Sequence, residues 1–160
     1  IRIAFKNVRK VKSMKKQKEL MKGVIEKEVD VCAINETGLV GEEFVEMERG
    51  YSWIGSNRGT EEERGGGVGF IIKGGLETQI LSKQEDLMAI KIKRPGRNVV
   101  IVGVYQACEG ENQQKNERRM EEIKRLVLDA NEDLVVVGGD MNGHIWELDG
   151  VESRHDVSMM

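Results

Sequence analysis

Four short polar motifs in this sequence carry side chains that together could hydrolyse a phosphodiester. They contain Asn7 in FKNVR, Glu36 in INETGL, Tyr105 in VGVYQA, and Asp140 with Asn142 in GGDMNGH. Mg²⁺ prefers oxygen ligands, often one or two carboxylates, and a carboxylate can also orient or deprotonate a water. Amide N–H groups and a tyrosine hydroxyl can donate hydrogen bonds to charge that grows on phosphorus. The residue types indicate metal-assisted phosphoryl chemistry, provided that the motifs converge.

Taken singly, each motif also has an ordinary structural interpretation. Asn7 could be a turn or cap residue, Glu36 a loop carboxylate and Tyr105 a packing residue at the edge of the core. Asp140-x-Asn142 is the most specific signal, because it directly follows an apolar run and a glycine pair. The functional interpretation rests on the motifs as an ordered set.

Other candidate groups are weaker. His144 lies two residues after Asn142 and could approach a bound substrate, whereas His155 has no motif around it. The run Gly65-Gly66-Gly67 is not followed by Gly-Lys-Ser/Thr, so it predicts a turn that opens a strand instead of a phosphate-binding loop. No Gly-x-Ser-x-Gly motif for a serine nucleophile is present.

The elements that would position the motifs begin with a strand–helix–strand unit. Alternating apolar and basic residues predict a strand over 1–5, and Ser13 is a predicted N-cap for a helix over about 14–28. Its predicted buried positions are Leu20, Met21, Val24 and Ile25. The apolar run 29–34 predicts a strand buried on both faces, so the unit fits two parallel strands joined by a helix.

Strands dominate the middle of the chain. They are predicted at 51–54, 68–73, 77–82, 87–93 and 98–104. Pro95-Gly96 predicts a type II turn between the last two strands. A helix over about 112–131 has a predicted buried stripe consisting of Met120, Ile123, Leu126, Val127 and Ala130. The run 134–137 predicts another fully buried strand, which leads into Asp140.

This order of elements predicts α/β sheets covered by helices on the outside. Glu36 and Asp140 each follow a predicted buried strand, and sites in such sheets form at the carboxyl ends of strands. If those ends are neighbours, one hollow contains both carboxylates together with the amides and the phenol.

The ordered motifs resemble the endonuclease/exonuclease/phosphatase superfamily, and they are closest in character to the endonuclease domains of non-LTR retrotransposons. The segments that carry the resemblance are KNVR at 6–9, NETGL at 35–39, RGGGVGFII at 64–72, VGVYQA at 102–107 and GGDMNGH at 138–144. The resemblance implies one domain over 1–160 with the four-layer α/β/β/α sandwich of the DNase I-like type.

The resemblance also implies a DNA-nicking activity that depends on Mg²⁺, with Mn²⁺ as an alternative. Glu36 would bind the metal, and Asn7 would be a second metal-site or phosphate partner. Tyr105 would contact the scissile phosphate, Asp140 would align the attacking water, and Asn142 would stabilise the transition state. His144 is a further candidate for substrate binding. In such elements the cut strand primes a reverse transcriptase domain on the same chain, which implies an intracellular and nuclear site of action.

The sequence departs from the family pattern in three places. Asn35 stands where glutamine is common, and Ala107 stands where proline is common. The family's final Ser-Asp-His motif is absent from these 160 residues, and Arg154-His155-Asp156 has the wrong order to replace it. We therefore expect a domain that lacks its final strands. Alone, it should be poorly soluble and nearly inactive, because catalytic groups act as a unit and missing strands expose apolar edges.

Composition and charge add limited constraints. Apolar residues make up 39% and charged residues 33%, which is typical of a globular protein. The net charge is −3, but residues 1–28 carry ten Lys or Arg and three Glu, so this basic segment could face phosphates. No apolar run approaches the ~20 residues that span a bilayer, and no membrane partner is expected. Cys32 and Cys108 are predicted to be buried thiols in a reducing compartment.

Three interpretations remain open at this stage. The first is a retrotransposon endonuclease. The second keeps the fold and changes the substrate to an abasic site in DNA or to a phospholipid. The third is a non-catalytic, decayed fragment that at most binds nucleic acid through residues 2–28.

Overall fold

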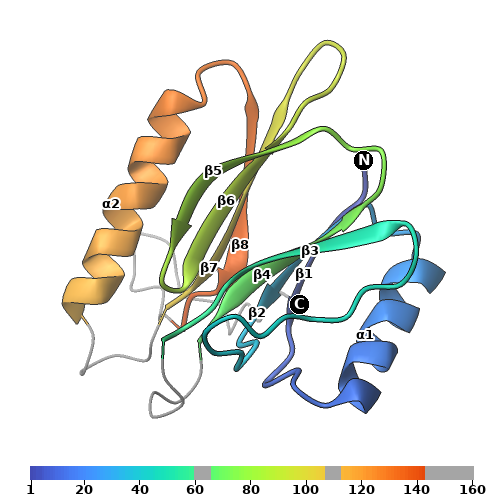
Figure 1. Cartoon of the computed structure of the whole chain (residues 1–160). Helices are drawn as coiled ribbons and strands as arrows, with labels where there is room; N and C mark the ends of the chain where they lie inside the picture. The colour runs from blue at the N-terminus through green and yellow to red at the C-terminus, as the bar shows by residue number, and fades with distance from the viewer. Residues whose placement is uncertain (60–65, 107–112, 143–160) are drawn as a thin grey trace, which may run out of the picture.

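Two four-stranded sheets face each other in the computed structural model, which describes residues 1–59, 66–106 and 113–142. Figure 1 shows α1 and α2 on opposite sides of the molecule, with the sheets between them. The elements are β1 (Ile3–Asn7), α1 (Met14–Glu26), β2 (Val31–Asn35), β3 (Tyr51–Ser56), β4 (Val68–Lys73), β5 (Thr78–Gln84), β6 (Leu87–Ile92), β7 (Val99–Tyr105), α2 (Gln113–Asp129) and β8 (Leu134–Asp140). This is the predicted α/β/β/α order of layers.

The first sheet has the strand order β1-β2-β4-β3. β1 and β2 are parallel, as the strand–helix–strand pattern predicts, and β4 pairs antiparallel with both β2 and β3. Ser13 caps α1 as predicted, since its side chain accepts a hydrogen bond from the N–H of Lys16 at 3.3 Å. The cap begins the helix that carries the chain from the end of β1 back to the start of β2.

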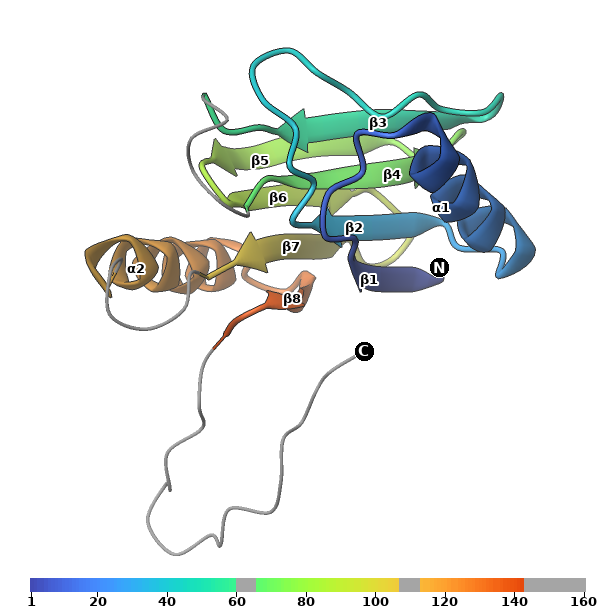
Figure 2. The ribbon, with the colours of Figure 1, turned by 90° about the horizontal axis from the view of Figure 1, so that it is seen from below.

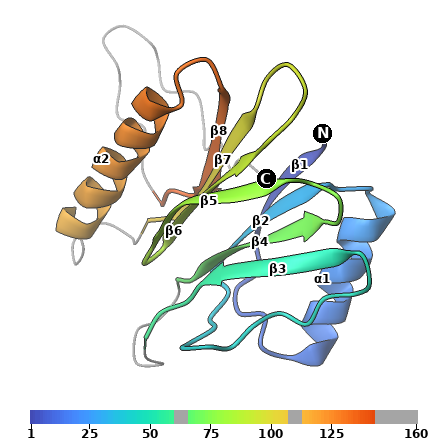
Figure 3. The same cartoon turned by 45° about the horizontal axis from the view of Figure 1, so that its top comes forward.

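The second sheet has the strand order β5-β6-β7-β8. The predicted β6–β7 hairpin is present, and its turn uses a positive φ of 85° at Gly96. α2 connects β7 to β8, and these two strands are parallel. Figure 3 shows the β6–β7 turn at the opposite end of the sandwich from the last residues of β8.

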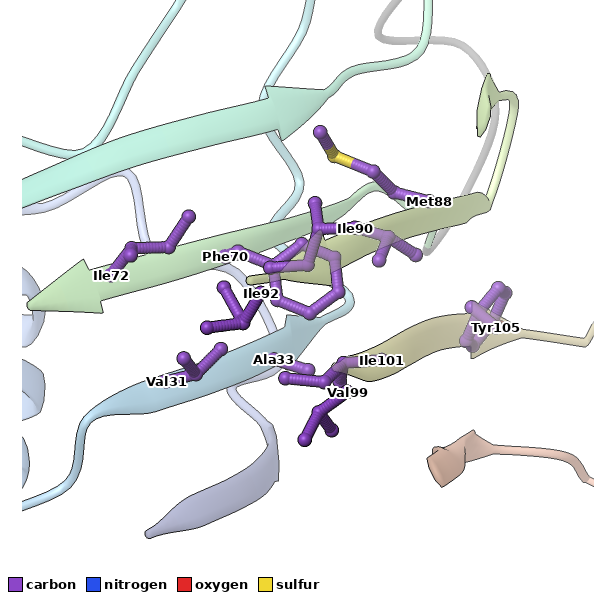
Figure 4. Close-up of a cluster of buried hydrophobic side chains, with 11 residues drawn as sticks. Val31, Ala33, Phe70, Ile72, Met88, Ile90, Ile92, Val99, Ile101 and Tyr105 are labelled. Carbon is purple, nitrogen blue, oxygen red and sulfur yellow. The ribbon is translucent and has the colours of Figure 1, made fainter. Parts of the chain in front are cut away.

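The main core lies between the two sheets. Phe70 on β4 is 0% exposed, and its ring lies among aliphatic side chains of β2, β6 and β7 (Figure 4). Two further clusters lie under the helices, one between α1 and the first sheet and one between α2 and the second. Burial on both faces explains why β2, β4, β6 and β7 are almost continuously apolar.

The predicted buried stripes of the helices are partly wrong. Ile25, Met120 and Val127 are 39–45% exposed, whereas Gln17 and Arg119 are buried. The side-chain amide of Gln17 donates to the carbonyl of Val11 at 3.0 Å, and this bond takes the place of the hydrogen bond that an exposed amide makes to water. Helical spacing of apolar residues cannot reveal a polar residue that is buried because it has a partner.

β8 is also less buried than its sequence predicts. Leu134 is 43% exposed, and the remaining residues of β8 are half-buried. Among the described residues, β8 is the last strand of its sheet, so one of its edges is unpaired. A run of apolar residues does not distinguish a central strand from an edge strand.

The structure bears on the predicted burial of the cysteines and on the prediction that no segment spans a membrane. Cys32 is buried, and burial raises the pKa of its thiol to about 11, so it is protonated at neutral pH. Cys108 lies outside the described residues. Within the described part of the chain, neither helix has the length and apolar character that a bilayer span requires.

Replacing Phe70 with alanine should lower the free energy of unfolding by about 3–5 kcal/mol, because a fully buried ring would leave a cavity. Phe44→Ala is the matched control, since Phe44 is 67% exposed. Its effect should stay within about 0.5 kcal/mol. Urea unfolding followed by circular dichroism measures both, and equal losses would contradict the inter-sheet position of Phe70.

Candidate active site

The carboxyl ends of β1, β2, β7 and β8 meet at one end of the sandwich. The register pairs Asn7 with Asn35 in the first sheet and Tyr105 with Asp140 in the second. Across the sheets, Nδ2 of Asn7 donates to Oδ2 of Asp140 at 2.9 Å, and Nδ2 of Asn35 donates to the carbonyl of Val104 at 2.5 Å. Figure 2 shows β1 and β8 at the same edge of the sandwich, next to β2 and β7 respectively, and residues of β1 and β8 contact each other. The structure therefore brings together strand ends that are far apart in the sequence.

A glycine pair allows the two sheets to approach closely here. A Cβ atom on Gly138 would lie 2.6 Å from the ring of Phe5. A Cβ atom on Gly139 would overlap the carbonyl of Val104 and the side chain of Asn35, and Gly139 has a φ of +141°. Packing against Phe5 of the opposite sheet thus requires the glycine at 138, whereas at 139 the neighbouring strand β7, Asn35 of the opposite sheet and the backbone conformation together require it.

Asp140 is held on both of its carboxylate oxygens. Oδ2 accepts from Asn7, and Oδ1 accepts from the backbone N–H of Asn142 at 3.1 Å. The backbone N–H of Gln106 donates to the carbonyl of Asp140 at 2.8 Å, and Nδ2 of Asn142 donates to the carbonyl of Gln106 at 2.7 Å. These bonds fix Asp140 and Asn142 beside the end of β7.

Glu36 is the first residue after β2 and lies at the same end of the sandwich. Its φ is +53°, and its carbonyl accepts from the N–H of Lys10 at 2.7 Å. The side chain is half-buried, and within the described residues its carboxylate makes no hydrogen bond or ion pair. A half-buried carboxylate in this position is available to a cation.

Tyr105 is the last residue of β7 and is only 8% exposed (Figure 4). Its ring belongs to the inter-sheet core, so the structural interpretation of this residue is confirmed. Its backbone N–H donates to the carbonyl of Asp86 at 2.9 Å. The expected contact between its hydroxyl and a phosphate stays a prediction. His144, the other expected substrate-binding residue, lies outside the described residues.

Sequence reasoning missed the role of Asn35. It is 1% exposed, and besides its bond to Val104 it has a buried Oδ1 with no hydrogen-bond partner among the described residues. The available signal was a single amide at the end of the apolar run VCAI, directly before Glu36. A buried amide in such a run needs partners from another strand.

Sequence reasoning also missed Asp86. Its carboxylate is 0% exposed and accepts from Arg58, Arg119 and the N–H of Gly67. No periodic pattern predicts this cluster, because its members come from four separate segments.

The residues at this end of the sandwich fit a hard divalent cation. The side chains of Glu36, Asp140, Asn7 and Asn35 supply oxygen atoms, and no described residue donates a hydrogen bond to the buried Oδ1 of Asn35. Mg²⁺ commonly uses one or two carboxylates and completes its shell with water and substrate phosphate. Among the described residues, no group of three or more His, Cys, Asp or Glu side chains could by itself hold a metal ion. A cation bound here would therefore need oxygen atoms from the amide side chains and from the substrate in addition to the carboxylates.

Comparisons with known proteins agree with this fold. No protein-family model and no curated protein sequence matches the chain. The endonuclease domain of TRAS1, a telomere-specific non-LTR retrotransposon, matches with a TM-score of 0.66 and 15% identity over 88% of this chain and 58% of that one. The AP endonuclease LMAP from Leishmania major matches with a TM-score of 0.67 and 17% identity over 86% of this chain and 53% of that one.

A third solved structure is D. rerio TDP2 complexed with a single-strand DNA product. It matches with a TM-score of 0.61 and 13% identity over 89% of this chain and 61% of that one. The chain thus spans between half and two thirds of the length of each of these structures. At such identities the likeness shows the fold, which is the DNase I-like sandwich of the endonuclease/exonuclease/phosphatase proteins.

Gly139→Ala should lower the free energy of unfolding by about 3 kcal/mol, because overpacking adds to the cost of a positive φ. Gly75→Ala is the matched control: Gly75 has a φ of +87°, but a Cβ there meets nothing within 4 Å. It should cost only about 1–2 kcal/mol. Equal costs in urea unfolding would argue against the close contacts of Gly139 with Val104 and Asn35.

Proposed function

We propose that this chain belongs to a metal-dependent phosphodiester hydrolase that cuts DNA, with its chemistry at the shared end of β1, β2, β7 and β8. One observation carries the proposal. Asn7 of the first sheet donates to Asp140 of the second at 2.9 Å, and Asn7 pairs in register with Asn35, the residue directly before Glu36. Two carboxylates and several amides from distant segments thus share one edge.

Glu36 and Asn7 would hold a Mg²⁺ ion, or Mn²⁺ in its place. When bound, such an ion neutralises phosphate charge and polarises the phosphoryl group. The assignment is supported by the unpaired, half-buried Glu36 side chain and by the side-chain oxygen of Asn7, which accepts from the N–H of Arg9 at 3.1 Å.

Asp140 would orient the attacking water and accept its proton. Each of its oxygens already accepts one N–H, from Asn7 and from Asn142, which leaves lone pairs on a carboxylate of fixed orientation. Asn142 donates one amide N–H to the carbonyl of Gln106, and its other amide N–H would donate to charge that develops on phosphorus. Tyr105 would add its hydroxyl to the phosphate contact.

The basic segment 1–28 supports DNA as the substrate. Arg9 and Lys10 are exposed, and they lie two and three residues after the site residue Asn7. Basic side chains next to a phosphodiester site raise the local concentration of a polyanion. TDP2, which shares the fold, was solved with a single-strand DNA product.

Two nuclease roles fit this proposal. The retrotransposon role rests on the ordered motifs and on the likeness to TRAS1, and it implies action in the nucleus with a reverse transcriptase domain on the same polypeptide. Abasic-site repair is the second candidate, because the likeness to LMAP is equally strong. The chain alone is expected to be nearly inactive, so even slow nicking of undamaged supercoiled plasmid favours the first role, and slow cleavage restricted to an abasic duplex favours the second.

The metal assignment predicts that the chain binds one Mn²⁺, observed by electron paramagnetic resonance. Glu36→Gln should weaken this binding by about tenfold or more, because it removes the charge of a direct ligand. Glu42→Gln is the control, since Glu42 is an exposed carboxylate six residues further along. No Mn²⁺ binding by the unaltered chain, or equal affinity of the Glu36 variant, would refute the assignment.

The DNA assignment predicts a salt-dependent affinity for duplex DNA that depends on the basic segment. Replacing Arg9 and Lys10 by glutamine should reduce the slope of log K against log salt concentration by about 2, because each phosphate contact contributes about 1. Lys83 and Lys124 are exposed on the second sheet and α2, so their double replacement is the matched control. If both double variants change the slope equally, the basic segment has no special role.

A further inference from the structure

Asp86, between β5 and β6, is a buried carboxylate that the proposed chemistry does not use. It is 0% exposed, and its side-chain oxygens accept four hydrogen bonds from described residues. Arg58 donates Nη2 at 2.5 Å and Nε at 3.2 Å, Nη2 of Arg119 donates at 3.0 Å, and the N–H of Gly67 donates at 2.7 Å. Such charge-assisted bonds are strong and fix the geometry of their partners.

One branch of these contacts leads from Asp86 to Glu36. The N–H of Gly67 is held by Asp86, while the carbonyl of Gly67 accepts from the N–H of Thr37 at 3.3 Å. Gly67 has a φ of +85°, and a Cβ atom there would overlap the hydroxyl of Thr37. Thr37 is fully buried and directly follows Glu36, so the position of Gly67 determines the turn that carries the Glu36 side chain.

A second branch leads from Asp86 to Asp140. The carbonyl of Asp86 accepts from the N–H of Tyr105 at 2.9 Å, and the next N–H, that of Gln106, donates to the carbonyl of Asp140 at 2.8 Å. Asp86 has a φ of +60°, a strained value for a non-glycine residue. In this conformation its side chain reaches the Gly67 turn while its carbonyl reaches Tyr105.

We propose that Asp86 is a positioning residue of the candidate active site. It fixes the Glu36 turn of the first sheet relative to the Tyr105–Asp140 end of the second. Arg119 on α2 donates to the same carboxylate, so the position of α2 is coupled to that of Asp86. The proposal rests on the proposed function, because it assigns Asp86 to the geometry of that site. A carboxylate with only a structural role would change stability without changing metal affinity.

The test compares Asp86→Asn with Asp133→Asn. Asp133 is a matched control, because it accepts from Lys91 at 2.8 Å and from Asn98 at 3.1 Å at the opposite end of the same sheet. Asp86→Asn should weaken Mn²⁺ binding at least tenfold. It should also speed amide hydrogen exchange at both Thr37 and Gln106 relative to the core amide of Ile101. Asp133→Asn should change neither quantity, whatever its effect on stability.

Arg58→Lys covers the case in which Asp86→Asn fails to fold. It keeps the positive charge but loses the two-point contact, so both readouts should change in the same direction by a smaller factor. Faster exchange at only one of the two amides, or unchanged Mn²⁺ affinity in a folded variant, overturns the proposal. If the unaltered chain binds no Mn²⁺, the proposed function fails, and the paired exchange at Thr37 and Gln106 still decides whether Asp86 joins the two turns.

Discussion

The contact between the two sheets at the carboxyl ends of their parallel strands is the constraint on which the rest of the site depends. It consists of the Asn7–Asp140 hydrogen bond, the Asn35–Val104 hydrogen bond and the close packing that the absence of a Cβ atom at Gly138 and Gly139 allows. Amides span the gap because each offers a donor to the opposite sheet. Without the glycines, the strands would be too far apart for these short side chains to meet.

The geometry of this contact also determines which chemistry is available. Both oxygens of Asp140 are held by N–H donors, so the carboxylate has one orientation. Glu36 lies at the same end, and its carboxylate has no protein partner among the described residues. A carboxylate held in place and a second one, without a partner among the described residues, at the same end of the sandwich fit a division of roles between aligning water and binding a cation. Asp86 contacts Gly67 and Tyr105, and these are hydrogen-bonded or adjacent to the segments that carry Glu36 and Asp140, which is why we propose a positioning role for it.

The sequence predicts the parts of this molecule that local patterns encode. Ser13 predicts the start of α1, Pro95-Gly96 predicts the β6–β7 turn, and apolar runs predict β2 and β7. The polar residue after each of these strands could be identified because strand ends in α/β sheets form sites. These local patterns suffice for the layers and for the candidate positions.

Contacts through space could not be predicted in the same way. Asn35 contacts Val104 across 69 positions of sequence, and Arg119 is buried because Asp86 lies opposite. Helical periodicity therefore placed Met120 inside and overlooked Arg119. The half-exposure of β8 depends on which strand lies at the edge of the sheet, which is a property of topology and not of composition.

If four strand ends surround one cation site, paramagnetic broadening by Mn²⁺ should reveal it. Mn²⁺ is titrated into the ¹⁵N-labelled chain while amide resonances are recorded. Amides near Asn7, Glu36, Gln106 and Asp140 should broaden together at the lowest Mn²⁺ concentration, while those of Gly75 and Gly96 persist. Broadening restricted to one sheet, or spread evenly over the acidic surface, would contradict it.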